Sequence, residues 1–193
     1  MPNVTRYHPA LVALHSLLAL FIPAALALGA LVLAKIPNAS PMKIEGLRSH
    51  MIGGMLILAL MLLRLFVRTG TAHPPAATAG HALLDRVAWW SHRLLYALVI
   101  AMAASGLFMA LQTRLFVSVL GGGGPLPADF WAFPIRWVHY LVSRLLMALI
   151  ALHVAGALYH AFIRKDGLLR RMVFGRRFAA AREAAATPSA SSR

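Results

Sequence analysis

The stretch RWVHYLVSRLLMALIALHVAGALYH, residues 136–160, decides the fold of this chain of 193 residues. It contains no acidic residue, and it places His139 and His153 fourteen positions apart. At 3.6 residues per turn this interval is just under four turns of α-helix, so both imidazoles project from nearly one face, about 21 Å apart along the axis. An ionisable side chain at bilayer depth is costly, so these two histidines indicate a function.

The rest of the chain has the composition of an integral membrane protein. Hydrophobic residues make up 60% of it and charged residues only 12%, about half the charged share of a soluble domain. Four apolar stretches approach the roughly 20 residues that cross a bilayer: 11–33, 51–63 with its flanks, 94–111 and 145–163. We predict an all-α, four-helix membrane bundle over residues 1–171, followed by a basic, partly disordered tail over residues 172–193.

The first apolar stretch has two possible interpretations, a membrane helix and a cleaved signal peptide. It is longer than the apolar core of a signal peptide, and no compact basic start precedes it. It contains Pro23, which membrane helices tolerate because neighbouring helices satisfy the freed carbonyl. We therefore expect a kinked membrane helix.

The net charge of +14 follows mostly from topology. Thirteen of the nineteen Lys and Arg residues fall on one predicted side of the membrane and the other six on the opposite side. By the positive-inside rule, the first side is cytoplasmic and holds both termini. The tail brings no recognisable nucleic-acid-binding fold, so we expect membrane lipid and no nucleic acid as its partner.

Histidine is the residue available to hold a redox cofactor. The chain has nine histidines and no cysteine, which excludes disulfides, zinc–thiolate centres and iron–sulfur clusters. Predicted depth pairs four of them. His50 and His139 lie in the outer leaflet and His15 and His153 in the inner half, so each pair can hold one iron. The hypothesis that follows is two bis-histidine b haems stacked across the bilayer.

Two glycines support this hypothesis. Gly29 and Gly106 follow His15 and His92 by the same fourteen residues, so each leaves room for a porphyrin edge on a histidine-bearing face. Close helix packing explains any one of these glycines equally well, and a hydrogen bond to a neighbouring helix explains any single histidine. Zinc fits less well, because neither pair has a thiolate or acidic ligand nearby.

The inner half has two further histidines. His92 and His160 are candidates to replace an inner ligand, to bind a haem propionate or to exchange protons with a quinone. His8, His73 and His81 fall in loops or termini, and the sequence assigns them no role.

At these residues the chain resembles the bacterial di-haem cytochrome b561 family, whose best-defined activity is that of a superoxide oxidase. The resemblance covers about residues 6–171 and rests on five motifs: ALHS with His15, RSHMIGG with His50, SHRLLYAL with His92, RWVHYLV with His139, and LHVAGALYH followed by RKDGLLRRM with His153 and His160. It implies haem ligation by His15, His50, His139 and His153, and a bacterial inner-membrane location.

The resemblance also implies an activity. Superoxide would give single electrons to the outer haem, and ubiquinone near the inner haem would receive them, with His160 at the quinone site. Arg64 is a candidate partner for a propionate or a quinone oxygen, or an arginine that snorkels to headgroups. The outer cations Arg48, Arg136 and Arg144 would steer the superoxide anion.

Two other functions remain open at this point. One is a cytochrome b membrane-anchor subunit that couples a dehydrogenase, hydrogenase or reductase to quinone, as a complex with that redox partner. The other is a haem-free structural protein of four membrane helices. A homodimer and a complex with a redox partner subunit are both open, and an active free monomer or homodimer would count against the anchor.

Overall fold

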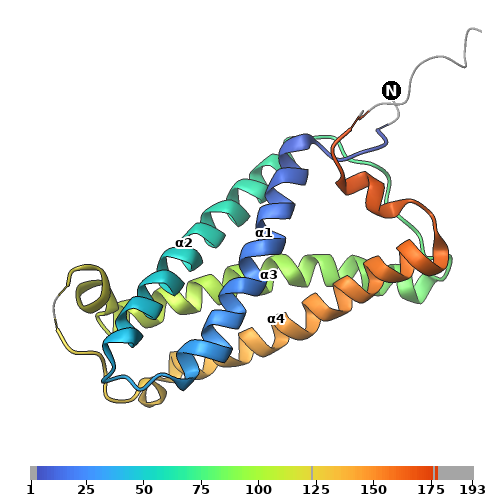
Figure 1. The fold of residues 1–193 in the computed structure, drawn as a ribbon. Helices are drawn as coiled ribbons and strands as arrows, with labels where there is room; N and C mark the ends of the chain where they lie inside the picture. The colour runs from blue at the N-terminus through green and yellow to red at the C-terminus, as the bar shows by residue number, and fades with distance from the viewer. Residues whose placement is uncertain (1–3, 123, 176, 178–193) are drawn as a thin grey trace, which may run out of the picture.

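Four long helices make up most of the chain. The computed structural model describes residues 4–122, 124–175 and 177. Its long helices are α1 (Pro9–Ala27), α2 (Pro41–Thr69), α3 (Ala82–Gln112) and α4 (Pro134–Leu158) (Figure 1). Six short 3₁₀ or π segments join or extend them: η1 (Leu28–Val32), η2 (Leu33–Lys35), η3 (Phe116–Leu120), η4 (Phe130–Ala132), η5 (Tyr159–Arg164) and η6 (Leu168–Met172).

The four helices are long and apolar enough to cross a membrane. With their extensions they run over Pro9–Lys35, Pro41–Thr69, Ala82–Gln112 and Pro134–Arg164, which is 27 to 31 residues each. The predicted four-helix membrane bundle is confirmed, and the chain is a multi-pass membrane protein. α1 continues through Pro23 to Ala27 and passes into the π segment η1.

The helices begin earlier than the apolar stretches do. α2 starts at Pro41 and α3 at Ala82, because a hydropathy pattern marks only the part of a helix inside the hydrocarbon, and the polar first turns continue beyond it. Proline occupies the first turn of α1, α2 and α4, where its missing N–H costs nothing. His8 and His81 accept hydrogen bonds from the N–H groups of Ala10 and Leu83, so both are helix caps.

The helices pack in two pairs. α1 lies beside α2, and α3 lies beside α4; α2 and α3 connect the pairs, whereas α1 and α4 touch little. Figure 1 shows the pairs close together at the end of the bundle opposite the termini and diverging toward the end that carries them. We call these the distal end and the proximal end. The first holds the connections 36–40 and 113–133, and the second holds the connection 70–81.

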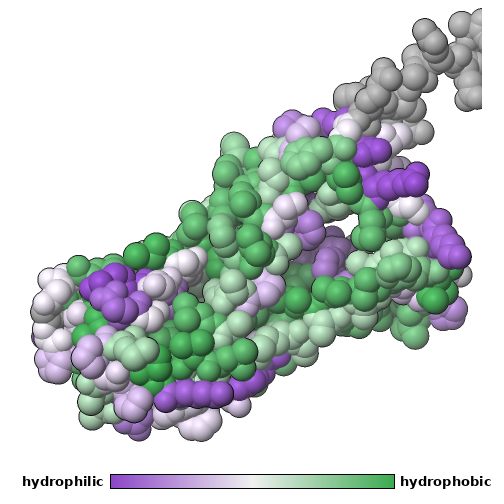
Figure 2. All heavy atoms as spheres, in the orientation of Figure 1, coloured by the Kyte–Doolittle hydropathy of each residue, from purple (hydrophilic) through white to green (hydrophobic). Residues whose placement is uncertain are grey.

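The core between the helices is thin. One cluster of buried side chains joins all four helices: Leu18, Leu26, Ile57, Met61, Val99 and Leu146. A second cluster fills the distal end: Leu33, Leu47, Ala110, Leu115, Val119 and Phe130. Most other large apolar side chains are exposed over the long helices, as the green surface in Figure 2 shows. Lipid contact accounts for this exposure in a membrane protein.

A C-terminal strap, residues 164–175 with Arg177, crosses the open proximal end. Its arginines donate to backbone carbonyls of the connection 70–81: Arg164 Nη1 to Ala79 O at 2.6 Å, Arg171 Nη1 to Pro75 O at 2.7 Å, and Arg177 to Ala72 O. The N-terminal residues join it, since the Tyr7 N–H donates to Arg171 O at 3.1 Å. The predicted basic, partly disordered tail covers residues 172–193. The structure describes residues 172–175 and 177 of this tail, and the others lie outside the described residues.

The core cluster gives a first prediction. Leu146 is 1% exposed and Leu141, on the same helix, is 58% exposed. Leu146→Ala removes buried methyl groups and leaves a cavity, which costs about 2–5 kcal/mol and should lower the unfolding midpoint by roughly 5 °C or more. The measurement is thermal unfolding in detergent, followed by size-exclusion chromatography. Leu141→Ala is the matched control, and an equal shift in both variants would contradict this assignment of the core.

Candidate functional site

Two histidine pairs lie at different depths of the bundle, and α4 contributes one residue to each. His139 of α4 faces His50 of α2, with ring centroids 6.3 Å apart. His153 of α4 faces His15 of α1, with ring centroids 6.4 Å apart. The structure therefore brings together the same four histidines that predicted depth pairs. We call them the distal pair and the proximal pair.

The spacing within each pair fits two histidines that would hold one metal ion between them. A bond of about 2 Å from each imidazole nitrogen to the metal, plus about 1.1 Å from nitrogen to ring centre, puts the two centroids about 6.2 Å apart. Direct ring stacking or a hydrogen bond would draw the rings closer. The separations of 6.3 and 6.4 Å agree with this distance, so the residues fit a haem held by two histidines.

Ser105 sets the orientation of His139. The Ser105 hydroxyl donates to Met102 O at 2.9 Å, so its oxygen is left to accept from the Nδ1–H of His139, also at 2.9 Å. This fixes the proton on Nδ1 and leaves the Nε2 lone pair for a metal, as supporting hydrogen bonds do around ligating histidines. The sequence prediction missed Ser105; its position directly before Gly106 was the available signal.

His50 has a buried nitrogen with no partner. Its Nδ1 makes no hydrogen bond within the described part of the chain. The Ala25 backbone interacts with this imidazole without reaching full hydrogen-bond geometry, which leaves the ring able to bind a further group.

Glycines give the distal pair its room. A Cβ on Gly29 would lie 3.3 Å from Cε1 of His50, and a Cβ on Gly106 would lie 3.1 Å from Cε1 of His139. Both distances are tighter than ordinary van der Waals contact. The two glycines predicted from their fourteen-residue spacing therefore lie directly against the distal imidazoles. Gly53, Gly54 and Gly156 have open space instead.

Two cavities border the distal pair. A cavity of about 120 Å³ lies toward α2 and α3 and is lined almost entirely by apolar side chains. A cavity of about 410 Å³ lies toward α1 and α4 and includes Arg136, Tyr140 and Arg144. His50 and His139 line both. A flat ligand held between them has an apolar space on one side and a space with cations on the other.

The distal cations differ in their freedom to act on an anion. Arg136 lies 4.2 Å above the ring of Trp131 and Arg144 lies 4.8 Å above that of Tyr140. Arg48 instead pairs with Glu45 at 2.7 Å and lies outside the cavity lining. The buried Lys43 ammonium donates to Leu33 O and Ile36 O, so its role is to close the end of η2.

A third histidine lies beside the proximal pair. The ring of His92 is 5.2 Å from that of His153, closer than two imidazoles that share one metal ion would be. Its Nδ1 lies 2.7 Å from Ala88 O on its own helix. The ring separations therefore favour His15 with His153 as the ligand pair, with His92 as an accessory.

Arg64 of α2 completes the proximal surroundings. Its guanidinium donates to the Tyr96 hydroxyl and lies 5.0 Å from the centre of that ring. Its Nε is buried and makes no hydrogen bond within the described residues. A cation with an unused donor in the bundle fits an anionic or carbonyl oxygen of a bound group.

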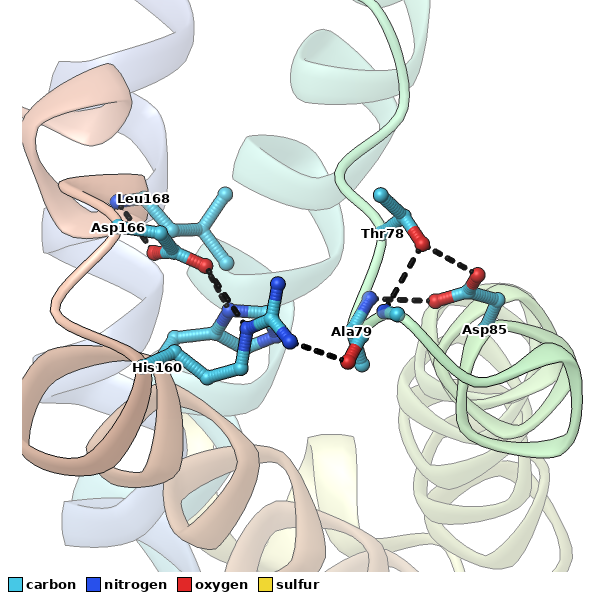
Figure 3. A network of polar contacts seen from close by, with 8 residues as sticks. Thr78, Ala79, Asp85, His160, Asp166 and Leu168 are labelled. Atoms are coloured by element: carbon cyan, nitrogen blue, oxygen red, sulfur yellow. Dashed lines mark hydrogen bonds and ion pairs between the residues drawn. The ribbon is translucent and has the colours of Figure 1, made fainter.

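His160 lies outside both histidine pairs, on η5, and contacts the carboxylate of an acidic residue. Its Nδ1 lies 2.6 Å from Oδ2 of Asp166 (Figure 3). The hydrogen bond from His160 holds the pKa of the Asp166 carboxyl below its ordinary value, so this carboxylate stays ionised. Nothing in the sequence prediction included Asp166; the available signal was one acidic residue in a strongly basic segment.

The four candidate ligand histidines lie in two facing pairs within the described residues. No three His, Cys, Asp or Glu side chains in that part of the chain gather into a group that could hold an ion. A pair of histidines needs a ligand that supplies the remaining coordination positions itself, and a porphyrin does so.

Comparison with known proteins agrees with this arrangement. The sequence matches the family described as prokaryotic cytochrome b561 over residues 6–175. The chain belongs to this family, which confirms the resemblance found in its motifs. It is therefore a membrane cytochrome b that functions in electron transfer, in a family that typically binds haem b. No curated protein matches the sequence.

The contact between Gly106 and His139 gives a second prediction. Gly106→Val places a branched side chain where a Cβ alone reaches 3.1 Å from the imidazole, so His139 must move. We expect the haem content per chain to fall, measured by the pyridine haemochrome spectrum against protein concentration. The control is Ala101→Val, on the exposed side of the same helix. Equal haem content in both variants would contradict the role of Gly106.

Proposed function

We propose that the chain is a superoxide:ubiquinone oxidoreductase of the bacterial inner membrane, with the proximal end in the cytoplasm. One observation supports this most: α4 holds one member of each histidine pair, so two one-electron centres would stand at different depths of the bundle. The distal pair would hold one haem b and the proximal pair a second. Haem b held by two histidines is coordinatively saturated and carries single electrons.

At the distal end, the chain attracts the donor. Arg136 and Arg144 line the larger cavity beside the distal pair, and cations around a cavity raise the encounter rate of an anion. Arg48 contributes less than its charge suggests, because Glu45 neutralises it. Each superoxide anion that loses an electron leaves as dioxygen.

At the proximal end, the chain binds the acceptor. Ubiquinone takes up two electrons, from two superoxide anions, and two protons to become ubiquinol. Arg64 offers a donor for a quinone oxygen, with Tyr96 holding its guanidinium. The imidazole of His160 can transfer protons. His92, beside the proximal pair, is placed to contact either the haem or the quinone. Figure 2 shows the surface hollowed between α1 and the C-terminal strap, which gives a lipid-borne quinone a way in.

The experiment that tests the proposal is stopped-flow mixing of the oxidised protein with superoxide. We expect rapid appearance of the reduced b-type spectrum, with two haems per chain, followed by reoxidation when ubiquinone-1 is added. His139→Ala should remove one haem and the fast reaction, whereas His153→Ala should remove the other haem and the reoxidation by quinone. One haem per chain in the wild type, or no reduction by superoxide, would contradict the proposal.

Copurification, together with the stopped-flow result, distinguishes the alternative function from the proposed one. A redox subunit that copurifies in stoichiometric amount, together with haems that superoxide leaves oxidised, would identify the chain as a membrane anchor for that partner. Activity of a free monomer or homodimer would count against the anchor.

Steering by the distal cations gives a separate prediction. Arg144→Gln should lower the second-order rate constant of haem reduction by superoxide about two- to tenfold at low ionic strength, because the cavity loses one positive charge. The difference should shrink in high salt, where the charge is screened. Lys35→Gln, which removes an exposed cation outside the cavity lining, is the control. Equal effects in both variants would show a general charge effect.

A further inference from the structure

Asp166 is held in place by an unusual turn. Lys165 has φ +52° and Gly167 has φ +70°, so left-handed residues stand on both sides of it. For a lysine this conformation is costly. The turn reverses the chain after η5 and returns the Asp166 carboxylate to His160, six residues earlier. Backbone strain of this kind persists only where the surrounding structure holds it.

Both oxygens of the Asp166 carboxylate accept hydrogen bonds in this position. Oδ2 receives the Nδ1–H of His160 at 2.6 Å, and Oδ1 receives the Leu168 N–H at 3.0 Å. A carboxylate on Nδ1 fixes the imidazole proton there and leaves Nε2 with its lone pair. Nε2 makes no hydrogen bond to any described residue. The His160 side chain is 12% exposed, and Nε2 is not among the fully buried polar atoms without a partner, so this nitrogen can be reached from outside the pair.

Arg164 fastens this pair to the connection 70–81. Its Nε lies 3.8 Å from Oδ2 of Asp166, while its Nη1 donates to Ala79 O. A Cβ on Gly80 would lie 2.9 Å from that Nη1, so a glycine there lets the arginine approach. Figure 3 shows the two halves of the network facing each other.

The connection itself is braced from α3. Asp85 accepts from the Thr78 hydroxyl and from the Ala79 N–H, both at 2.6 Å. The Ala79 peptide, whose carbonyl accepts from Arg164, is therefore also held in place from α3. The network links the start of α3 to His160.

We propose that Asp166 is a positioning residue that keeps the His160 proton on Nδ1 and presents Nε2 to ubiquinone, with Arg164 locking the pair to the α2–α3 connection. This rests on the proposed function and names the proton donor of its quinone site. His160 takes a proton from water at Nε2 and passes it to an oxygen of the reduced quinone; Nδ1–H stays on Asp166. Two such transfers and two electrons complete one ubiquinol.

The test is the oxidation of fully reduced protein by ubiquinone-1 in a stopped-flow instrument. Asp166→Ala should slow the reaction at saturating quinone about tenfold or more and change the half-saturating concentration less than twofold, because binding is not its role. His160→Ala should be equally slow. The double variant should be no slower than His160→Ala alone, since residues that act through one another are not additive. Asp166→Glu should recover most of the rate.

A spectroscopic measurement tests the position of the His160 proton independently of activity. In protein labelled with ¹⁵N-histidine and free of quinone, His160 should carry its proton on Nδ1, and Asp166→Ala should shift that proton to Nε2. Asp166→Asn, whose amide oxygen can still accept from Leu168 N–H, provides a variant that keeps the turn. Asp129→Ala, which removes a carboxylate that caps a turn at the distal end, is the control with an unchanged rate.

Three outcomes would overturn the role of Asp166: an unchanged rate in Asp166→Ala, slowing in the double variant equal to the product of both single effects, or a wild-type His160 with its proton on Nε2. Failure of ubiquinone-1 to oxidise the wild-type protein would instead contradict the proposed function. The tautomer measured without quinone remains informative about the pair in that case.

Discussion

The fourteen-residue interval between His139 and His153 on α4 is the constraint on which the rest of the structure depends. Because α4 presents both imidazoles from nearly one face, each facing histidine has to come from another helix at the matching depth. α2 supplies His50 and α1 supplies His15. The two helix pairs can then separate at the proximal end without breaking either contact, which leaves space for a group between α1 and α4.

Periodicity explains why the fold and the pairing were predictable from sequence. Hydrophobic length marks the spans, and residue number along a helix converts directly to depth, so the sequence alone pairs His50 with His139. The tight contacts of Gly29 and Gly106 followed from the same arithmetic. Helix starts were predicted less well, because Pro41 and Ala82 lie in polar turns that hydropathy does not register.

The supporting contacts of the site needed three-dimensional information. Ser105 on α3 contacts His139 on the neighbouring α4, and Asp166 reaches His160 only because Lys165 and Gly167 adopt left-handed conformations. Neither contact leaves a periodic trace in the sequence. Arg48 shows the opposite case: its charge was visible, but its pairing with Glu45, which reduces its effect on an anion, depends on side-chain geometry.

The order of the pairs along the chain has a consequence for biosynthesis. His50 and His139 are nested between His15 and His153, so the distal pair can form once α4 has begun to enter the membrane. The proximal pair waits for the rest of α4, and the arginines of the strap bind the connection 70–81 last of all. A nascent chain would thus mature from the distal end toward the proximal end, and a truncated product would lose proximal closure first.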